Sequence, residues 1–353
     1  MNDVYKRLAK HLDDLPAGFP ATDSGVELRI LKRFFSPEEA EIAMRLTMRP
    51  EPASTIAERL DMDPSEMEQA LEKMSKKGLV FRIRKGDQPL FMAAQFVVGI
   101  WEYHLNDLDE ELIRDFNAYS PYLMKEAWAE QKTKQLRVIP VSRSVSAEMA
   151  VMPYEKAEEI IKSQSKILVA PCICRKEHAM VGKGCDRPLE SCLVFGAGAY
   201  FYKENGLGRF ISQEEALQVL KKAQESGLVL QPGNAKKTVN ICTCCGCCCQ
   251  ILKNLKEMDS PATAMSTNYY AWVNEEDCAS CGTCVERCQM DAIAVDDVAH
   301  IDLLRCIGCG LCVTTCETGA IRLAAKAEAD QWVPPENMYK TYAKMARERG
   351  KIQ

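Results

Sequence analysis

The sequence predicts an α+β protein with three domains and a C-terminal tail, and three observations support this prediction. Helix-start signals followed by a hairpin pattern occupy the N-terminal part of the 353 residues. Ten of the 18 cysteines lie in the middle of the chain between strand and helix patterns, and the other eight repeat one spacing near the C-terminus. A chain of this length with 47% hydrophobic residues can bury several cores. We place the domains at residues 1–95, 96–258 and 269–326, with the tail at 327–353.

The first domain, residues 1–95, begins its helices at recognisable caps. Ser36 and Glu39 form a capping box, and Asp63 precedes the proline that opens a later helix, with a further helix between them. Residues 79–92 form two short strand patterns around a Lys-Gly-Asp turn and predict a β-hairpin. Three helices followed by a hairpin resemble a winged helix-turn-helix domain, which implies a DNA-binding or a protein-docking role.

Charge along the third helix argues against DNA recognition. In a winged helix-turn-helix domain the N-terminal half of that helix enters the major groove, and here it carries Glu66, Glu68 and Glu72 with no arginine. Basic residues that would contact phosphates follow near the hairpin. They are Lys73, Lys76, Lys77, Arg82, Arg84 and Lys85. We therefore expect a docking or dimerisation module, with a DNA-binding regulator as the alternative.

The middle region, residues 96–258, is predicted to be a helical connector followed by a cysteine-rich α/β domain. Residues 136–141 and 166–170 have the apolar character of strands, with a helix at 153–162 between them. A later helix has Ser212 as its N-cap. No glycine-rich phosphate loop follows a strand, so nothing points to a flavin or nicotinamide site.

Ten cysteines of the middle region are candidate metal ligands. They are Cys172, Cys174, Cys185, Cys192, Cys242, Cys244, Cys245, Cys247, Cys248 and Cys249. The first two follow a predicted buried strand, at the position where α/β sheets commonly place their sites. Because side chains adjacent in sequence diverge, we expect at most about four of the last six to bind one metal centre.

Eight cysteines near the C-terminus form two copies of the pattern C-x2-C-x2-C-x3-C. The copies are Cys278, Cys281, Cys284 and Cys288, then Cys306, Cys309, Cys312 and Cys316. At this spacing three thiolates of one loop bind three corners of an iron–sulfur cube, and the fourth cysteine ligates the neighbouring cube. We therefore predict two [4Fe-4S] clusters, one bound by Cys278, Cys281, Cys284 and Cys316 and the other by Cys306, Cys309, Cys312 and Cys288.

Residues 272–323 resemble a bacterial-type two-cluster ferredoxin domain, which implies a pseudo-twofold ferredoxin-like βαβ arrangement and electron transfer. Glycines stand between the ligands, where the backbone must turn sharply: Gly282, Gly308 and Gly310. Proline usually follows the fourth cysteine in that family, whereas here Gln289 and Glu317 do. The alternatives for these eight cysteines, zinc sites or disulfides, do not require a doubled spacing of this kind.

A neighbouring ferredoxin-like segment favours electron relay as the use of the ten upstream cysteines. We predict one or two additional iron–sulfur clusters there. One alternative is a zinc site formed by Cys172, Cys174, Cys185 and Cys192, and another is a set of free, redox-active thiols. We interpret His178, in the same segment, as a solvated loop residue rather than as a ligand.

The formal net charge of −5 is concentrated near the C-terminus. Residues 272–325 contain nine acidic residues and three arginines, a net charge of −6, so the remainder of the chain carries about +1. A redox partner with a basic docking surface would complement this end. The chain has no run of about 20 apolar residues and no signal-peptide pattern at its N-terminus. We expect a cytoplasmic protein without a membrane span, in which thiols stay reduced and bind metal.

These features predict a multi-cluster iron–sulfur protein that relays single electrons between soluble redox partners in anaerobic metabolism. One alternative is a redox-sensing winged-helix regulator that binds DNA. Another is an oxidoreductase whose chemistry occurs at the upstream cysteines. The sequence assigns no catalytic residue.

Overall fold

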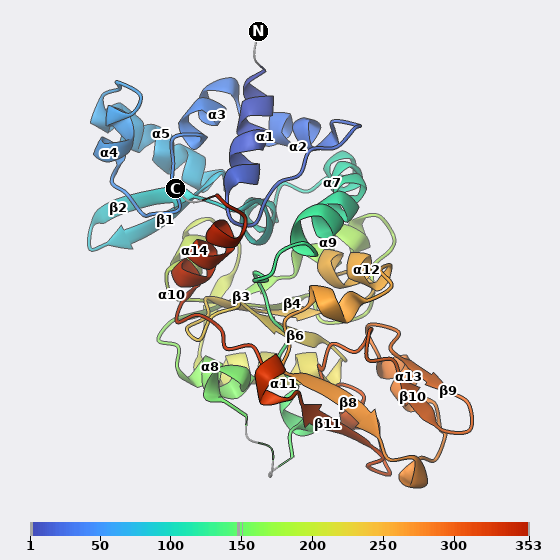
Figure 1. Ribbon diagram of the computed structural model, residues 1–353. Coiled ribbons are helices and arrows are strands. Elements are labelled where there is room, and N and C mark those ends of the chain that lie inside the picture. The colour runs from blue at the N-terminus through green and yellow to red at the C-terminus, as the bar shows by residue number, and fades with distance from the viewer. Residues whose placement is uncertain (1–2, 147–148, 150, 352–353) are drawn as a thin grey trace. The chain divides into compact units, whose positions relative to one another are not determined.

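The computed structural model describes residues 3–146, 149 and 151–351 (Figure 1). Its helices and small sheets make a mixed α+β structure. Contacts divide the chain into two compact units. The helical unit consists of Met1–Trp128, Ala197–Arg209 and Tyr342–Gln353, and the cysteine unit consists of Ala129–Gly196 and Phe210–Thr341.

The helical unit contains a series of helices and one hairpin. Its longer helices are α1 (Val4–Asp14), α2 (Val26–Phe34), α3 (Pro37–Ala43), α4 (Ala53–Glu58), α5 (Pro64–Lys76), α7 (Glu110–Tyr122) and α10 (Gly196–Glu204). Strands β1 (Val80–Lys85) and β2 (Gln88–Ala93) follow α5 and pair antiparallel. Helix α14 (Met338–Glu348) passes from the cysteine unit into this one.

Local side-chain caps start helices α3 and α5. The Ser36 side chain accepts a hydrogen bond from the Glu39 N–H at 3.2 Å, and the Glu39 carboxylate accepts one from the Ser36 N–H at 2.9 Å. The Asp63 carboxylate accepts from the N–H groups of Ser65 and Glu66, at 2.9 and 3.1 Å. The chain therefore runs through three helices, α3 to α5, and then the hairpin, in the order that the sequence predicts.

Segments from much later in the sequence complete the helical unit. The ring of Phe201 in α10 lies 4.8 Å from that of Phe81 in β1. After α14, the Arg349 guanidinium donates to the carbonyl oxygens of Asp13 and Leu15 at 2.8 and 2.7 Å. The helical unit thus includes residues beyond the predicted first domain. The predicted boundaries stay predictions, because one compact unit can hold more than one domain.

A five-stranded sheet forms the centre of the cysteine unit, in the order β5-β3-β4-β7-β6. The strands are β3 (Ile167–Pro171), β4 (Glu190–Phe195), β5 (Arg209–Ile211), β6 (Val229–Pro232) and β7 (Asn240–Cys244). Because β4 is antiparallel to both β3 and β7, these two run in the same direction and end at one edge of the sheet. We call it the cysteine edge, since a cysteine run follows each of the two strands there.

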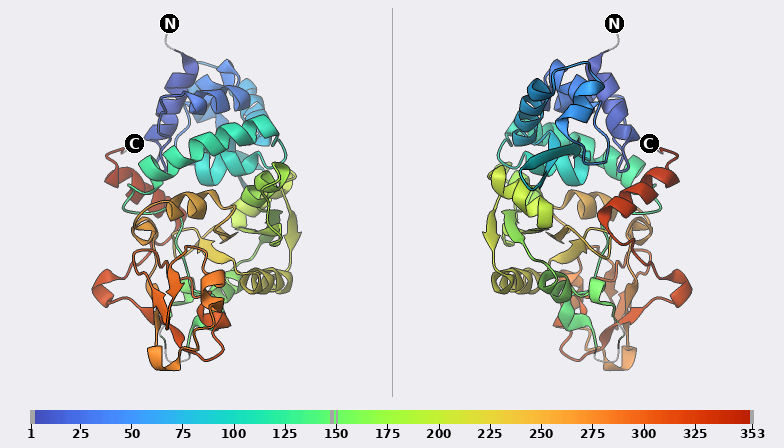
Figure 2. Two further views of the ribbon diagram at one scale, coloured as in Figure 1. Left: turned by 90° about the vertical axis from the view of Figure 1, so that its right-hand side faces the viewer. Right: turned by 90° about the vertical axis from the view of Figure 1, so that its left-hand side faces the viewer.

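Helices begin at the cysteine edge and cover the sheet. Helix α9 (Ile173–Met180) follows β3, and α12 (Gln250–Lys256) follows β7 (Figure 1). Helices α8 (Ala157–Lys162) and α11 (Gln213–Glu225) contact each other, and α11 also contacts β3 and β4 (Figure 2). The Ser212 hydroxyl caps α11 by accepting a hydrogen bond from the N–H of its third residue at 3.1 Å.

Two predictions for the middle region need correction. The predicted strand at 136–141 is an extended segment that makes only isolated bridges, from Leu136 to Gly233 and from Ile139 to Leu230. The pairs β3–β4, β4–β7 and β6–β7 are all antiparallel. An α/β domain has a largely parallel sheet, so this region is better described as α+β.

Two smaller sheets follow in the C-terminal part of the cysteine unit. Antiparallel pairs join β8 (Tyr269–Val273) to β11 (Ile321–Ala325) and β9 (Ile293–Val295) to β10 (Ala299–Ile301). Helix α13 (Thr283–Arg287) precedes β9, and a single 3-10 turn (Val313–Thr315) precedes β11. The first cysteine run surrounds α13, and the second surrounds the 3-10 turn. None of the helices in the described part of the chain combines the length and the apolar character that crossing a membrane requires.

Candidate metal centres

Four cysteines line one cavity in the C-terminal part of the cysteine unit. They are Cys278, Cys281, Cys284 and Cys316, which we call site A. Three come from the first run and the fourth from the second. Cys281 is exposed, whereas Cys284 is buried. Four thiols around one cavity are the ligand set that a [4Fe-4S] cluster requires.

The other four cysteines of the two runs also lie together. They are Cys306, Cys309, Cys312 and Cys288, which we call site B. Burial, together with the nearby thiols of Cys288 and Cys306, raises the pKa of Cys309 to about 12. Burial and the same neighbours raise the pKa of Cys312, which also lies near Cys284 of site A. Buried thiols of this kind become thiolates when a metal supplies the compensating positive charge.

Backbone N–H groups donate hydrogen bonds to sulfur in both sites, and the internal repeat relates four of these bonds. The four bonds, of 3.3 to 3.5 Å, are Ala299 to Cys278 and Ile321 to Cys316 in site A, and Ala292 to Cys288 and Ala271 to Cys306 in site B. Such bonds stabilise the negative charge of cluster ligands and tune the reduction potential. The donor set of both sites therefore suits a [4Fe-4S] cluster.

Glycines with left-handed backbone conformations form the ligand loops. Gly282 has φ of +77° directly before α13, and Gly308 and Gly310 have φ of +65° and +74° between ligands of site B. Other residues rarely adopt this conformation. A side chain at position 308 would also collide with the Tyr269 carbonyl group. These positions therefore need glycine for the loops to close around their ligands.

The ten upstream cysteines separate into two groups at the cysteine edge. Cys185, Cys245, Cys247 and Cys248 form the first, which we call the four-thiol site, and their sulfur atoms all lie within 4.8 Å of one another. The Cys248 sulfur is 3.7 Å from those of Cys247 and Cys185. Cys185 lies in the loop before β4, and the other three lie in the turn between β7 and α12. These four thiols are spaced as possible ligands of one metal.

The remaining six cysteines form a continuous chain of hydrogen-bonded thiols, the six-thiol group. Its order is Cys172, Cys174, Cys249, Cys244, Cys242 and Cys192. Hydrogen bonds from both neighbours hold the pKa of Cys249, and likewise that of Cys242, well below the ordinary value. The thiols of Cys174 and Cys244 each donate to both neighbours, which holds the pKa of each well above the ordinary value. Such a group can bind iron or act as redox-active thiols.

Arg175 on α9 is a buried cation among these thiols. Its side chain donates to the Thr243 carbonyl oxygen at 2.9 Å and to the Cys245 sulfur at 4.0 Å. Although burial opposes the charged form, the neighbouring sulfur groups of Cys172, Cys245 and Cys244 raise the pKa of Arg175 above its usual value. The guanidinium thus remains charged and stabilises negative sulfur at the cysteine edge.

His178 also lies on α9, where the sequence suggested a solvated loop residue. That prediction is wrong, because the side chain is only 4% exposed. Its Nδ1 lies 2.8 Å from the Cys174 carbonyl oxygen, and its Nε2 lies 3.3 Å from the Lys253 Nζ of α12. Both ring nitrogens therefore have protein partners, and His178 helps to hold α9 beside α12.

The two groups differ from those considered from the sequence. The alternative zinc set of Cys172, Cys174, Cys185 and Cys192 is divided, because only Cys185 belongs to the four-thiol site. The sequence neighbours Cys244 and Cys245 belong to different groups, and so do Cys248 and Cys249, because their side chains point in different directions. Cys247 and Cys248 do not diverge, since both belong to the four-thiol site.

Gln289 joins the turn of the four-thiol site to site B. Its side-chain oxygen accepts a hydrogen bond from the Gly246 N–H at 2.9 Å, and the side chain is 6% exposed. Gly246 lies between Cys245 and Cys247, and a side chain there would collide with the Gln289 carbonyl group. Sequence reasoning missed this contact. The only signal was the departure from the usual proline after Cys288.

Comparison with known families identifies the C-terminal part. Residues 271–294 and 299–322 match the family model described as the 4Fe-4S binding domain. The matched segments contain the two cysteine runs, so the chain carries two ferredoxin-type 4Fe-4S motifs and is an iron–sulfur protein. In comparisons with curated proteins and with solved structures, no match was found.

Proposed function

We propose that this iron–sulfur protein relays single electrons between soluble redox partners in the cytoplasm of an organism with anaerobic metabolism. Site A is the port for one partner, and site B passes electrons to or from the cysteine-rich part. The observation that carries the proposal is the different environment of the two sites. Site A has an exposed ligand, whereas site B is joined through Gln289 to the turn that holds Cys245 and Cys247.

Site B contacts the cysteine-rich part at several places, including three sets of hydrogen bonds close to its ligands. The Val141 N–H donates to the Cys309 carbonyl oxygen at 3.0 Å. The Arg287 side chain, next to a ligand, donates to the carbonyl oxygens of Gln224 and Glu225 at 2.7 and 3.0 Å. The third contact is the hydrogen bond from the Gly246 N–H to the Gln289 side chain. Electron transfer rates fall steeply with distance, so loops in direct contact support a short route between the centres.

Site A offers a surface to a partner. Cys281 is exposed, and Val285, on the helix that follows it, is 40% exposed. Exposed acidic side chains surround it in the sequence: Glu275, Glu276, Asp277, Glu286 and Glu317. A partner with a basic surface around its own redox centre fits this charge. Cys284 of site A lies near Cys312 of site B, which supports transfer between the two.

The six-thiol group is the candidate for a further iron–sulfur cluster in this relay. It contains more thiols than one cube needs, and Arg175 supplies positive charge beside it. The same arrangement favours a second candidate function, an oxidoreductase whose substrate reacts at the six-thiol group. Turnover by the isolated protein that disappears on Cys174→Ser would favour the oxidoreductase over the simple relay.

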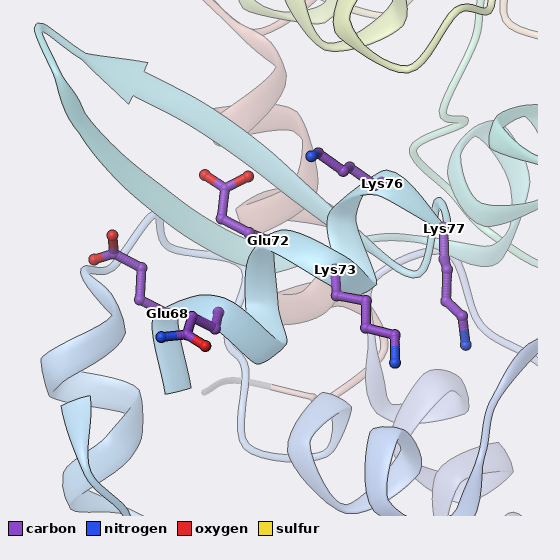
Figure 3. Close-up of a pocket in the computed structure, with 6 residues that line it drawn as sticks. Glu68, Glu72, Lys73, Lys76 and Lys77 are labelled. Carbon is purple, nitrogen blue, oxygen red and sulfur yellow. The ribbon is translucent and has the colours of Figure 1, made fainter. Parts of the chain in front are cut away.

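We further propose that α3 to β2 of the helical unit form a winged-helix module used for protein docking. Figure 3 shows the face of α5, where Glu68 and Glu72 lie among Lys73, Lys76 and Lys77 around a shallow pocket. Mixed charge of this kind does not favour a phosphate backbone. A sequence-specific complex between the holo-protein and promoter DNA would instead support the regulator.

Anaerobic redox titration followed by EPR tests the relay. We expect two reversible one-electron [4Fe-4S] signals, and a Cys281→Ser variant that alters the signal of site A while retaining that of site B. Cys192→Ser, in the six-thiol group, is the matched control, because it leaves both ferredoxin-type signals unchanged. Clusters that bind but do not cycle between oxidation states would contradict electron transfer.

A further inference from the structure

We propose that the four-thiol site binds a single zinc ion and is a structural element rather than an additional iron–sulfur cluster. Three observations lead to this assignment. They are the spacing of the sulfur atoms, the charges around them, and the position of the site in the fold.

The spacing of the sulfur atoms fits one tetrahedral ion. With zinc–sulfur bonds of about 2.3 Å, the sulfur atoms at the corners of a tetrahedron lie about 3.8 Å apart. The two distances from Cys248, to Cys247 and to Cys185, are both 3.7 Å. Cys245 lies within 4.8 Å of all three. The four thiols therefore already have almost the arrangement that zinc requires.

An iron–sulfur cube requires a wider arrangement. Each thiolate of a [4Fe-4S] cluster binds a different iron, so the width of the cube separates the cysteine sulfur atoms. Among the residues that the structure describes, neither site A nor site B has its four sulfur atoms within 4.8 Å of one another. The closer spacing at the four-thiol site thus distinguishes it from the two ferredoxin-type sites of the same chain.

The charges nearby match a zinc tetrathiolate. Four thiolates and one divalent cation have a net charge of −2. Two arginines face the site, with an Nη1 of Arg187 at 3.4 Å from the Cys247 sulfur and an Nη1 of Arg175 at 4.0 Å from the Cys245 sulfur. Arg175 is 3% exposed, and such burial of a cation is tolerated when negative charge compensates it. The two guanidinium groups balance the charge of the complex.

The chemistry of the ligands selects the metal. A tetrahedral set of four thiolates is typical of zinc, and zinc also binds such sites more tightly than ferrous iron does. Zinc has no redox activity of its own. Its role would therefore be to join the loop before β4 to the turn between β7 and α12.

This position makes the zinc a support for the neighbouring centres. The turn that it would hold contains Gly246, which donates to Gln289 beside site B. The same turn is flanked by Cys244 and Cys249 of the six-thiol group. One ion would thus fix the geometry of two possible electron centres without carrying electrons itself.

Metal analysis and X-ray absorption of the whole protein test the assignment without mutation. Protein purified anaerobically from iron-replete cells should contain about one zinc per chain, with four sulfur neighbours at about 2.3 Å and no iron near the zinc. An absence of zinc, or a zinc bound by nitrogen or oxygen ligands, would overturn the proposal.

A pair of variants locates the ion. Cys185→Ser should lower the zinc retained after dialysis against a chelator at least about fivefold, because it removes one of the four ligands. Cys192→Ser, a cysteine of the six-thiol group, should retain the zinc. The EPR signals of sites A and B serve as the folding control and report on the proposed electron transfer independently. Zinc retained in Cys185→Ser, or iron lost from it in place of zinc, would contradict this site.

Discussion

Gln289 and Glu317 follow the fourth cysteines of the two ferredoxin-type runs, but they lie in different environments. Gln289 is buried and accepts the Gly246 N–H, whereas Glu317 is exposed near Cys281. One residue thus connects site B to another part of the cysteine unit, and the other adds charge beside site A. Their individual substitution separates these two effects.

Replacing Glu317 with glutamine should raise the reduction potential of site A. A nearby carboxylate disfavours addition of an electron, and the substitution removes its charge while keeping its shape. Since Glu317 is exposed and screened by solvent, we expect a rise on the order of tens of millivolts at most. Potentiometric EPR measures both sites, with site B as the internal control. An unchanged or lowered potential of site A would refute this explanation.

Replacing Gln289 with leucine should loosen the turn that contains Gly246. The substitution leaves the Gly246 N–H without its acceptor in a buried place, a change that costs about 1–3 kcal/mol. Hydrogen exchange of the amides in this turn should become faster by about tenfold or more. Glu317→Gln, at the equivalent position of the other run, is the matched control. Equal exchange in wild type and Gln289→Leu would show that the bond does not support the turn.

At the scale of single elements, the hairpin β1–β2 is tied to its neighbours by ion pairs. Arg82 is 2% exposed at its side chain and lies 2.5 Å from carboxylate oxygens of Glu72 on α5 and Glu204 on α10. Arg84 also faces both carboxylates but is 43% exposed. Two of the basic residues that suggested phosphate contacts are therefore engaged within the protein.

Arg82→Ala should destabilise the helical unit more than Arg84→Ala. Removing the buried arginine leaves two partly buried carboxylates with only the more exposed Arg84 as their shared partner, which costs about 1–3 kcal/mol. Arg84→Ala should cost less than about 1 kcal/mol because the side chain is more exposed. Hydrogen exchange in β1 and β2 measures the difference. Normal stability of Arg82→Ala combined with loss of DNA binding would favour the regulator instead.

The sequence predicts local elements of this fold better than their pairing. The caps at Ser36, Asp63 and Ser212 involve residues three positions apart, so the sequence shows them directly. The pairing of β4 with β7 joins segments about 45 residues apart, and no local pattern reveals it. The grouping of the ten upstream cysteines depends on this pairing. The sequence could therefore identify the thiols but not which of them share a site.

At the scale of the whole molecule, acidic charge and exposure coincide at site A. Reduction of the protein by a basic redox protein should slow by about tenfold or more between 0.05 and roughly 0.5 M salt, because salt screens the attraction. Stopped-flow absorbance measures the rate, and a small neutral reductant provides the control. A rate that does not change or rises with salt would mean that the acidic residues do not guide the partner.

The helical unit is assembled from three stretches of the chain, and the last begins at Tyr342. During synthesis all 18 cysteines are added to the chain before that stretch. The carbonyl oxygens of Asp13 and Leu15 therefore lack their Arg349 donor at a stage when the nascent chain already contains every thiol that can receive metal. The helical unit therefore completes its contacts only after every metal-binding thiol has been synthesised, and the two units become complete in the reverse of their order along most of the chain.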